Sequence, residues 1–102
     1  MIEVHVEGRI ELGRLNEFDT GVRRYRYYLR ARDYVVPRVL HAMSGQMNTI
    51  RLVYQYPDVE GYLQHERNST SDAGYAEAAS GMPFADGTLT YTLYRPLEDQ
   101  AG

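Results

Sequence analysis

The hydrophobic pattern of this chain switches from the period of a strand to that of a helix and back again. Residues 2–10 and 47–56 alternate apolar and polar side chains, which predicts two half-buried strands. Their apolar positions are Ile2, Val4, Val6 and Ile10, and then Ile50, Leu52, Tyr54 and Tyr56. Between them, apolar side chains recur every three or four residues, which predicts an amphipathic helix. Its inward face comprises Leu15, Phe18, Val22, Tyr25 and Leu29.

Weaker signals place the remaining elements. Residues 34–43 are rich in β-branched side chains, and Pro37 restricts them to an edge strand because proline has no backbone N–H. Asn16 is expected to cap the first helix, and Asp58 a second one. The stripe of that second helix is predicted to be Val59, Tyr62, Leu63 and Glu66, with a loosened end over residues 68–72. Residues 75–79 predict a short helical turn, and residues 88–94 a last strand with Leu89, Tyr91 and Leu93 on one face.

The resulting order, β-α-β-β-α-β, is that of a ferredoxin-like fold. The predicted class is α+β, with both helices on one face of a four-stranded antiparallel sheet. A chain of 102 residues suits one domain, which we assign to residues 1–97, with residues 98–102 as a polar C-terminal tail. The other face of the third strand has too many apolar groups for a face exposed to solvent and too many polar groups for a core without water. Its residues, Thr49, Arg51, Val53 and Gln55, predict a homodimer formed through the sheet faces.

The composition excludes several kinds of chemistry. The chain has no cysteine for disulfides or thiolate-bound metals, and its 11 basic residues are all arginine, so no lysine can form a Schiff base. A net charge of −3 gives no reason to expect nucleic acid as a partner. Without an apolar span or signal peptide, a cytoplasmic protein with no membrane partner is expected. Ten tyrosines suit either a pocket that holds water or a ligand, or the rims of strands and helices.

Three stretches of the sequence resemble NIPSNAP proteins. The opening MIEVHVEGRIELGRLNEF is similar to their first strand, turn and helix beginning Glu-Phe. The stretch TIRLVYQYPDVEGYLQHER is similar to their third strand running into the second helix, although tyrosine stands here where the family usually has tryptophan. DAGYAE matches the place where the family has an acidic residue shortly before an aromatic one.

NIPSNAP proteins belong to the dimeric α+β barrel superfamily, together with antibiotic biosynthesis monooxygenases, haem-degrading monooxygenases and small polyketide cyclases. The resemblance implies a single domain over residues 1–97 that forms a dimeric α+β barrel. It also implies a ligand held in each protomer between the sheet and its helices. In the antibiotic monooxygenases an aromatic residue ends the third strand and a histidine follows nine residues later; Tyr56 and His65 have this spacing. The cyclases carry a tyrosine at the equivalent helix position.

His65, Tyr56 and Tyr54 are the candidate catalytic residues. An imidazole can exchange a proton with a substrate, and tyrosines can stack on or hydrogen-bond an aromatic ligand. The candidate substrate-binding residues are Tyr62, Asn48, Ile50, Leu52, Tyr25, Phe18 and Tyr75. His5 and Arg51 are secondary candidates that are expected to face the dimer interior in a charge network with no metal. If the first strand is turned over, His5 instead joins His65 in the cleft.

Taken with this resemblance, these residues favour a small cofactor-independent biosynthetic enzyme that acts on a hydrophobic, aromatic or polyketide-like molecule. Oxygenation by O2 and cyclisation or isomerisation by acid–base catalysis both fit. One alternative is a non-catalytic binding or accessory protein that uses the same cleft. Another is a haem-binding protein with His65 as the ligand, which the absence of tryptophan disfavours.

Overall fold

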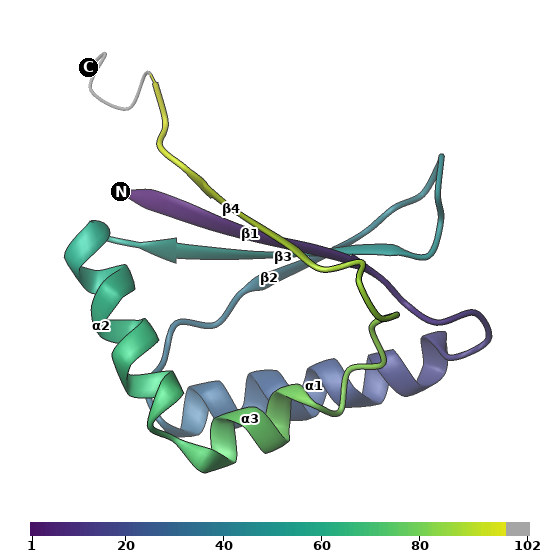
Figure 1. The fold of residues 1–102 in the computed structure, drawn as a ribbon, viewed down its shortest axis with the longest axis horizontal. Helices are drawn as coiled ribbons and strands as arrows, with labels where there is room; N and C mark the ends of the chain where they lie inside the picture. The colour runs from purple at the N-terminus through teal and green to yellow at the C-terminus, as the bar shows by residue number, and fades with distance from the viewer. Residues whose placement is uncertain (98–102) are drawn as a thin grey trace.

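The computed structural model describes residues 1–97, and the predicted tail at residues 98–102 lies outside them. The elements are β1 (Ile2–Arg9), α1 (Leu15–Ala31), β2 (Arg38–His41), β3 (Thr49–Tyr56), α2 (Val59–Thr70), α3 (Ala73–Ala79) and β4 (Thr90–Tyr94). The strands form one antiparallel sheet in the order β2-β3-β1-β4, and the helices lie on one side of it (Figure 1). The ferredoxin-like order is confirmed. None of the helices within residues 1–97 is long and apolar enough to cross a membrane.

The two central strands bury the faces that the alternation predicted. β1 and β3 pair so that Val4 lies opposite Tyr54 and Val6 opposite Leu52, and all four side chains are buried. The inward face of α1 completes the core with Phe18, Val22, Tyr25 and Leu29. Burial of such apolar side chains is the main force that holds a helix against a sheet. Leu15, the first position of the predicted stripe, remains exposed at the start of the helix.

The opposite face of the sheet carries the predicted polar network. His5 Nε2 lies 2.9 Å from the Glu3 carboxylate, while His5 Nδ1 lies 3.0 Å from Arg51 Nη1. Arg51 also forms an ion pair with Glu7. His5 therefore does not enter the cleft, and the alternative orientation of the first strand is wrong. The physical reason is that the apolar residues of β1 occupy the side facing α1.

Two predicted boundaries differ from the structure. Asn16 does not cap α1, because the backbone N–H of Phe18 donates to the carbonyl of Arg14 and makes Arg14 the cap position. The second strand is at the sheet edge, as predicted, but it begins only at Arg38. The backbone N–H of Tyr34 still bonds to the end of α1, so the chain is not yet free to pair as a strand.

Only part of the predicted stripe of helix α2 faces the sheet: Tyr62 and Glu66 line the pocket beneath it, but Val59 and Leu63 do not. Asp58 caps it as expected, since its side chain accepts a hydrogen bond from the Gly61 N–H at 2.8 Å. Val59 and Leu63, however, are 54% and 39% exposed. The inward positions are half-buried Tyr62, His65 and Ser69, which line a pocket. Polar groups are tolerated at these positions because the helix faces a cavity and not a dry core.

Residues 68–72 form a junction between helices and not a loosened end. α2 continues to Thr70, with the hydroxyls of its last turn bonded to backbone carbonyls. Asp72 then caps α3 by accepting from the Gly74 N–H at 3.0 Å. The same carboxylate accepts hydrogen bonds from the hydroxyls of Tyr28 and Tyr34 at 2.7 and 2.9 Å. Charged acceptors make strong hydrogen bonds, so Asp72 ties α3 to the end of α1.

The last strand lies at the uncovered edge of the sheet. β4 begins at Thr90, two residues later than predicted. Tyr91 pairs with Val6 and Leu93 with Val4, so these side chains do point to the helix side. Tyr91 is nevertheless 67% exposed, and it lines the same pocket as α2. This edge therefore leaves the space beneath the sheet accessible to solvent.

Candidate functional site

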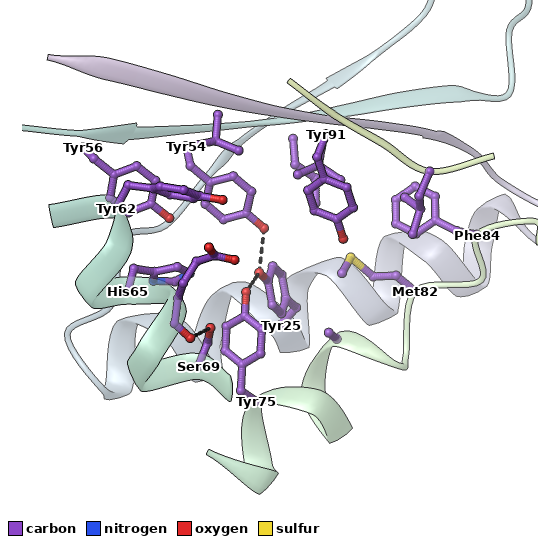
Figure 2. A pocket seen from close by; sticks show the side chains of 16 residues that line it. Tyr25, Tyr54, Tyr56, Tyr62, His65, Ser69, Tyr75, Met82, Phe84 and Tyr91 are labelled. Carbon is purple, nitrogen blue, oxygen red and sulfur yellow. Dashed lines mark hydrogen bonds between the residues drawn. The ribbon is translucent and has the colours of Figure 1, made fainter. Parts of the chain in front are cut away.

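A cavity of about 290 Å³ lies between the sheet and helices α2 and α3 (Figure 2). It is lined by Val4, Val6, Tyr25, Leu52, Tyr54, Tyr56, Tyr62, His65, Glu66, Ser69, Tyr75, Ala79, Met82, Phe84, Leu89 and Tyr91. Strands β1, β3 and β4 form its roof, and the helices contribute its floor and one wall. Its volume is close to the lower end of the range for small-molecule pockets, which suits a ligand of one or two rings.

Three tyrosine hydroxyls are joined at the base of this pocket. The Tyr25 hydroxyl lies 2.6 Å from that of Tyr54 and 2.8 Å from that of Tyr75, so Tyr25 bridges the other two (Figure 2). Tyr25 is only 1% exposed, and a buried phenol requires such partners. Burial raises the pKa of all three hydroxyls above that of a free phenol. They therefore stay neutral and act as hydrogen-bond donors and acceptors, not as phenolate bases.

His65 lies among aromatic rings at the centre of one wall. Its ring centroid is 5.4 Å from that of Tyr56, 5.9 Å from those of Tyr34 and Tyr75, and 6.3 Å from that of Tyr54. Burial lowers the pKa of His65, and the nearby charge of Glu66 opposes this only in part. The imidazole is therefore neutral at pH 7, with one nitrogen able to accept a proton.

The ring nitrogens of His65 remain available to a ligand. The tyrosine hydroxyls near His65 that form hydrogen bonds do so with one another or with Asp72, and none of these hydrogen bonds within residues 1–97 involves the His65 ring. Neither nitrogen is among the buried atoms without a partner, so both remain accessible from the cavity. A molecule in the pocket can thus exchange a proton with His65 without displacing a protein group.

The structure brings together most of the residues that the sequence nominated. The pocket lining includes His65, Tyr54, Tyr56, Tyr62, Leu52, Tyr25 and Tyr75. Asn48 is not part of it, because its side-chain amide donates to the Ile10 carbonyl at 2.9 Å. Ile50 is sealed in the core, and Phe18 packs edge-on against Phe84 behind the lining. His5 and Arg51 lie on the other face of the sheet.

Several lining residues were not nominated from the sequence. Glu66 lies four residues after Tyr62 and Ser69 four residues after His65, so helical spacing places both near the wall of the pocket. Glu66 was part of the predicted stripe of α2 but was not chosen as a site residue, and Ser69 lay outside that stripe. Met82 and Phe84 come from the irregular segment between α3 and β4. No periodicity marks such a segment.

Comparison with known proteins places the fold. The sequence matches no protein family model and no curated protein. An uncharacterised NIPSNAP domain protein from Burkholderia xenovorans superposes with a TM-score of 0.80 at 16% identity, over 97% of both chains. A NIPSNAP family protein from Agrobacterium tumefaciens gives 0.73 at 13% identity, over 96% of this chain and 94% of that one.

A third similar structure carries the name of an enzyme. A Bordetella bronchiseptica protein, provisionally named an antibiotic biosynthesis monooxygenase, superposes with a TM-score of 0.72 at 18% identity, over 94% of this chain and 96% of that one. Identities this low establish a shared fold and not a shared reaction. The chain has the NIPSNAP-like, ferredoxin-type fold that the resemblance in its sequence predicted.

Proposed function

We propose that this protein is a small enzyme that binds a hydrophobic aromatic or polyketide-like molecule in the tyrosine-lined pocket and transforms it by proton transfer through His65. The observation that carries the proposal is the neutral, unpartnered imidazole in the wall of that pocket. A base of this kind removes a proton from a carbon or hydroxyl of the ligand and returns it to another position. Cyclisation and isomerisation both need this step.

The surrounding tyrosines support this role. Tyr56 and Tyr62 form the part of the wall next to His65, with their ring centroids 5.5 Å apart. Their apolar rings can pack against an aromatic ligand, while their hydroxyls can hydrogen-bond a carbonyl or phenol oxygen. A donor placed at an oxygen that gains negative charge stabilises the transition state. Oxygenation by O2, the activity named for one structural neighbour, would use the same deprotonated ligand.

A binding protein without catalysis is the second candidate. Its support is that the hydroxyl of Tyr54, which is buried beside His65, already shares a hydrogen bond with the hydroxyl of Tyr25, so part of its hydrogen-bonding capacity serves the protein itself. Haem binding is less well supported, because a cavity of about 290 Å³ favours one or two rings over a macrocycle.

Ligand binding at His65 can be tested with β-naphthol, a neutral two-ring phenol. The three histidines of the chain lie in separate places: His65 in the pocket, His5 on the outer sheet face and His41 bonded to the Met47 carbonyl. In NMR spectra of the imidazole signals, we expect saturable shifts for His65 alone. Equal shifts at all three histidines, or none that saturate, would show that the pocket does not bind such molecules.

We further propose that the protein is a homodimer joined through the outer faces of two sheets. That face carries the network around His5 and Arg51, flanked by Leu40 and Tyr94, which are 45% and 46% exposed. Pairing two such faces would remove these exposed apolar side chains from water, while the charges between them are already hydrogen-bonded to one another. Sedimentation is expected to show a dimer that Leu40→Glu converts to monomer. The control Leu12→Glu, at an exposed position in a turn, should leave it intact; a wild-type monomer at micromolar concentration would refute the proposal.

A further inference from the structure

The pocket has an unusual distribution of charge. Among the 16 side chains that line it, Glu66 is the only carboxylate, and burial disfavours the charged form of His65, the only basic one. The sequence has 11 arginines, and none of them is in the lining. A ligand in this space therefore meets one negative charge and no positive charge.

The Glu66 carboxylate is not neutralised by its neighbours on the helix. Arg67, the next residue, points its guanidinium to Glu60 at 3.1 Å. The other ion pairs within residues 1–97 involve different carboxylates. The charge of Glu66 instead acts on groups of the pocket, where it raises the pKa of Tyr56 and Tyr62 in addition to the larger effect of their burial.

Aromatic rings supply the rest of the environment. Tyr54, Tyr56, Tyr62, Tyr75 and Tyr91 all contribute to the lining. The face of an aromatic ring attracts cations, by about 0.5–2 kcal/mol depending on how far the cation is desolvated. A carboxylate beside several such rings is the combination that recognises ammonium groups. An anionic ligand would lose its hydration here and gain no arginine in return.

We propose that Glu66 selects the charge of the ligand, so that the pocket prefers an aromatic molecule bearing an ammonium group and rejects one bearing a carboxylate. This inference rests on the proposed function for its binding site and adds the substrate class: an aromatic ring joined through an alkyl chain to an amine, which is protonated at neutral pH. The hydrophobic ring lies against the tyrosines, and the ammonium group lies near Glu66, which remains in contact with solvent. His65, the preceding residue on α2, is then next to the charged end of the ligand.

A matched series of three ligands tests this selection. Phenethylamine, phenethyl alcohol and hydrocinnamate share a phenyl ring on a two-carbon chain and end in an ammonium, a hydroxyl and a carboxylate. Affinities are measured at pH 7.5 from the saturable shift of the His65 imidazole signal. For the wild type we expect the amine to bind about tenfold more tightly than the carboxylate, because Glu66 attracts the first and repels the second and the aromatic rings also favour the cation. The alcohol should lie between them.

Glu66→Gln keeps the size and polarity of the side chain and removes its charge. In this variant the preference of amine over carboxylate should fall to about threefold, the share that the unchanged aromatic rings supply. Glu77→Gln on α3 is the matched control, because it changes the net charge equally at a position outside the pocket lining; it should keep the wild-type order.

Three results would overturn the inference: equal affinities for amine and carboxylate in the wild type, an unchanged preference in Glu66→Gln, or an equal loss of preference in Glu77→Gln. Failure of the proposed enzymatic function is distinct from these. It would appear as full turnover in a His65 variant, while the wild type still binds the amine more tightly than the alcohol and the alcohol more tightly than the carboxylate.

Discussion

The His65→Ala variant is expected to turn over the natural substrate roughly 10²–10⁴-fold more slowly than the wild type, the usual scale of general acid–base catalysis. The imidazole is the proton acceptor that the pocket presents to its ligand, and neighbouring tyrosines cannot replace it because burial raises their pKa. The measurement is steady-state turnover. The loss should appear in kcat more than in KM, because the aromatic walls that bind the ligand are unchanged.

The pH profile provides a second readout of the same residue. Burial lowers the pKa of His65, so turnover should stay constant as pH falls through about 6.5, the usual histidine value, and decline only below it, when the imidazole becomes protonated. His41→Ala removes an exposed imidazole outside the pocket and is the control. Full activity in His65→Ala, or inactivity that follows from unfolding, would show that His65 is a structural residue.

Gly21→Ala is expected to lower the free energy of unfolding by about 2–3 kcal/mol, as overpacking of a filled interior does. A Cβ at position 21 would lie 2.2 Å from the Gly81 carbonyl oxygen and 2.7 Å from its carbon. Backbone atoms cannot rotate aside, so the segment after α3 must move away from α1. The gain in helix propensity from glycine to alanine, about 1 kcal/mol, offsets only part of this cost. Denaturant unfolding measures the change.

Gly81→Ala is the matched control for this contact. It adds a methyl group to the other of the two glycines in contact. There the nearest atoms are 3.7 and 3.8 Å away, an ordinary van der Waals distance. Its stability should stay close to that of the wild type. Equal destabilisation by both substitutions would show that the contact between α1 and the segment after α3 is not what requires Gly21. Because that segment carries Met82 and Phe84, Gly21→Ala should also weaken ligand binding.

The correct part of the site prediction came from local geometry. Tyr54 and Tyr56 alternate on β3, and the Pro57 turn returns the chain so that two turns of helix place His65 over the sheet. Each step depends on residues close in sequence, for which periodicity and caps are reliable guides. The wrong site assignments concerned residues that lie on the same face of a strand as the true pocket residues but in a different environment. Ile50 lies on the same strand face as Tyr54, yet it is sealed in the core outside the pocket.

The sequence by itself determined the order of elements, the buried rows of β1 and β3, the inward face of α1 and the position of His65 near the end of β3. These follow from the alternation of apolar and polar residues, because a strand or helix must turn its apolar side to the core. Tertiary structure alone decided which side of α2 faces inward. Val59 and Leu63 of the predicted stripe stay exposed, because α2 overhangs a cavity, and His65 and Ser69 lie beside Tyr62 on the inward side. It also decided that Tyr25, Tyr54 and Tyr75 share hydrogen bonds, since three elements far apart in sequence meet only when the helices pack on the sheet.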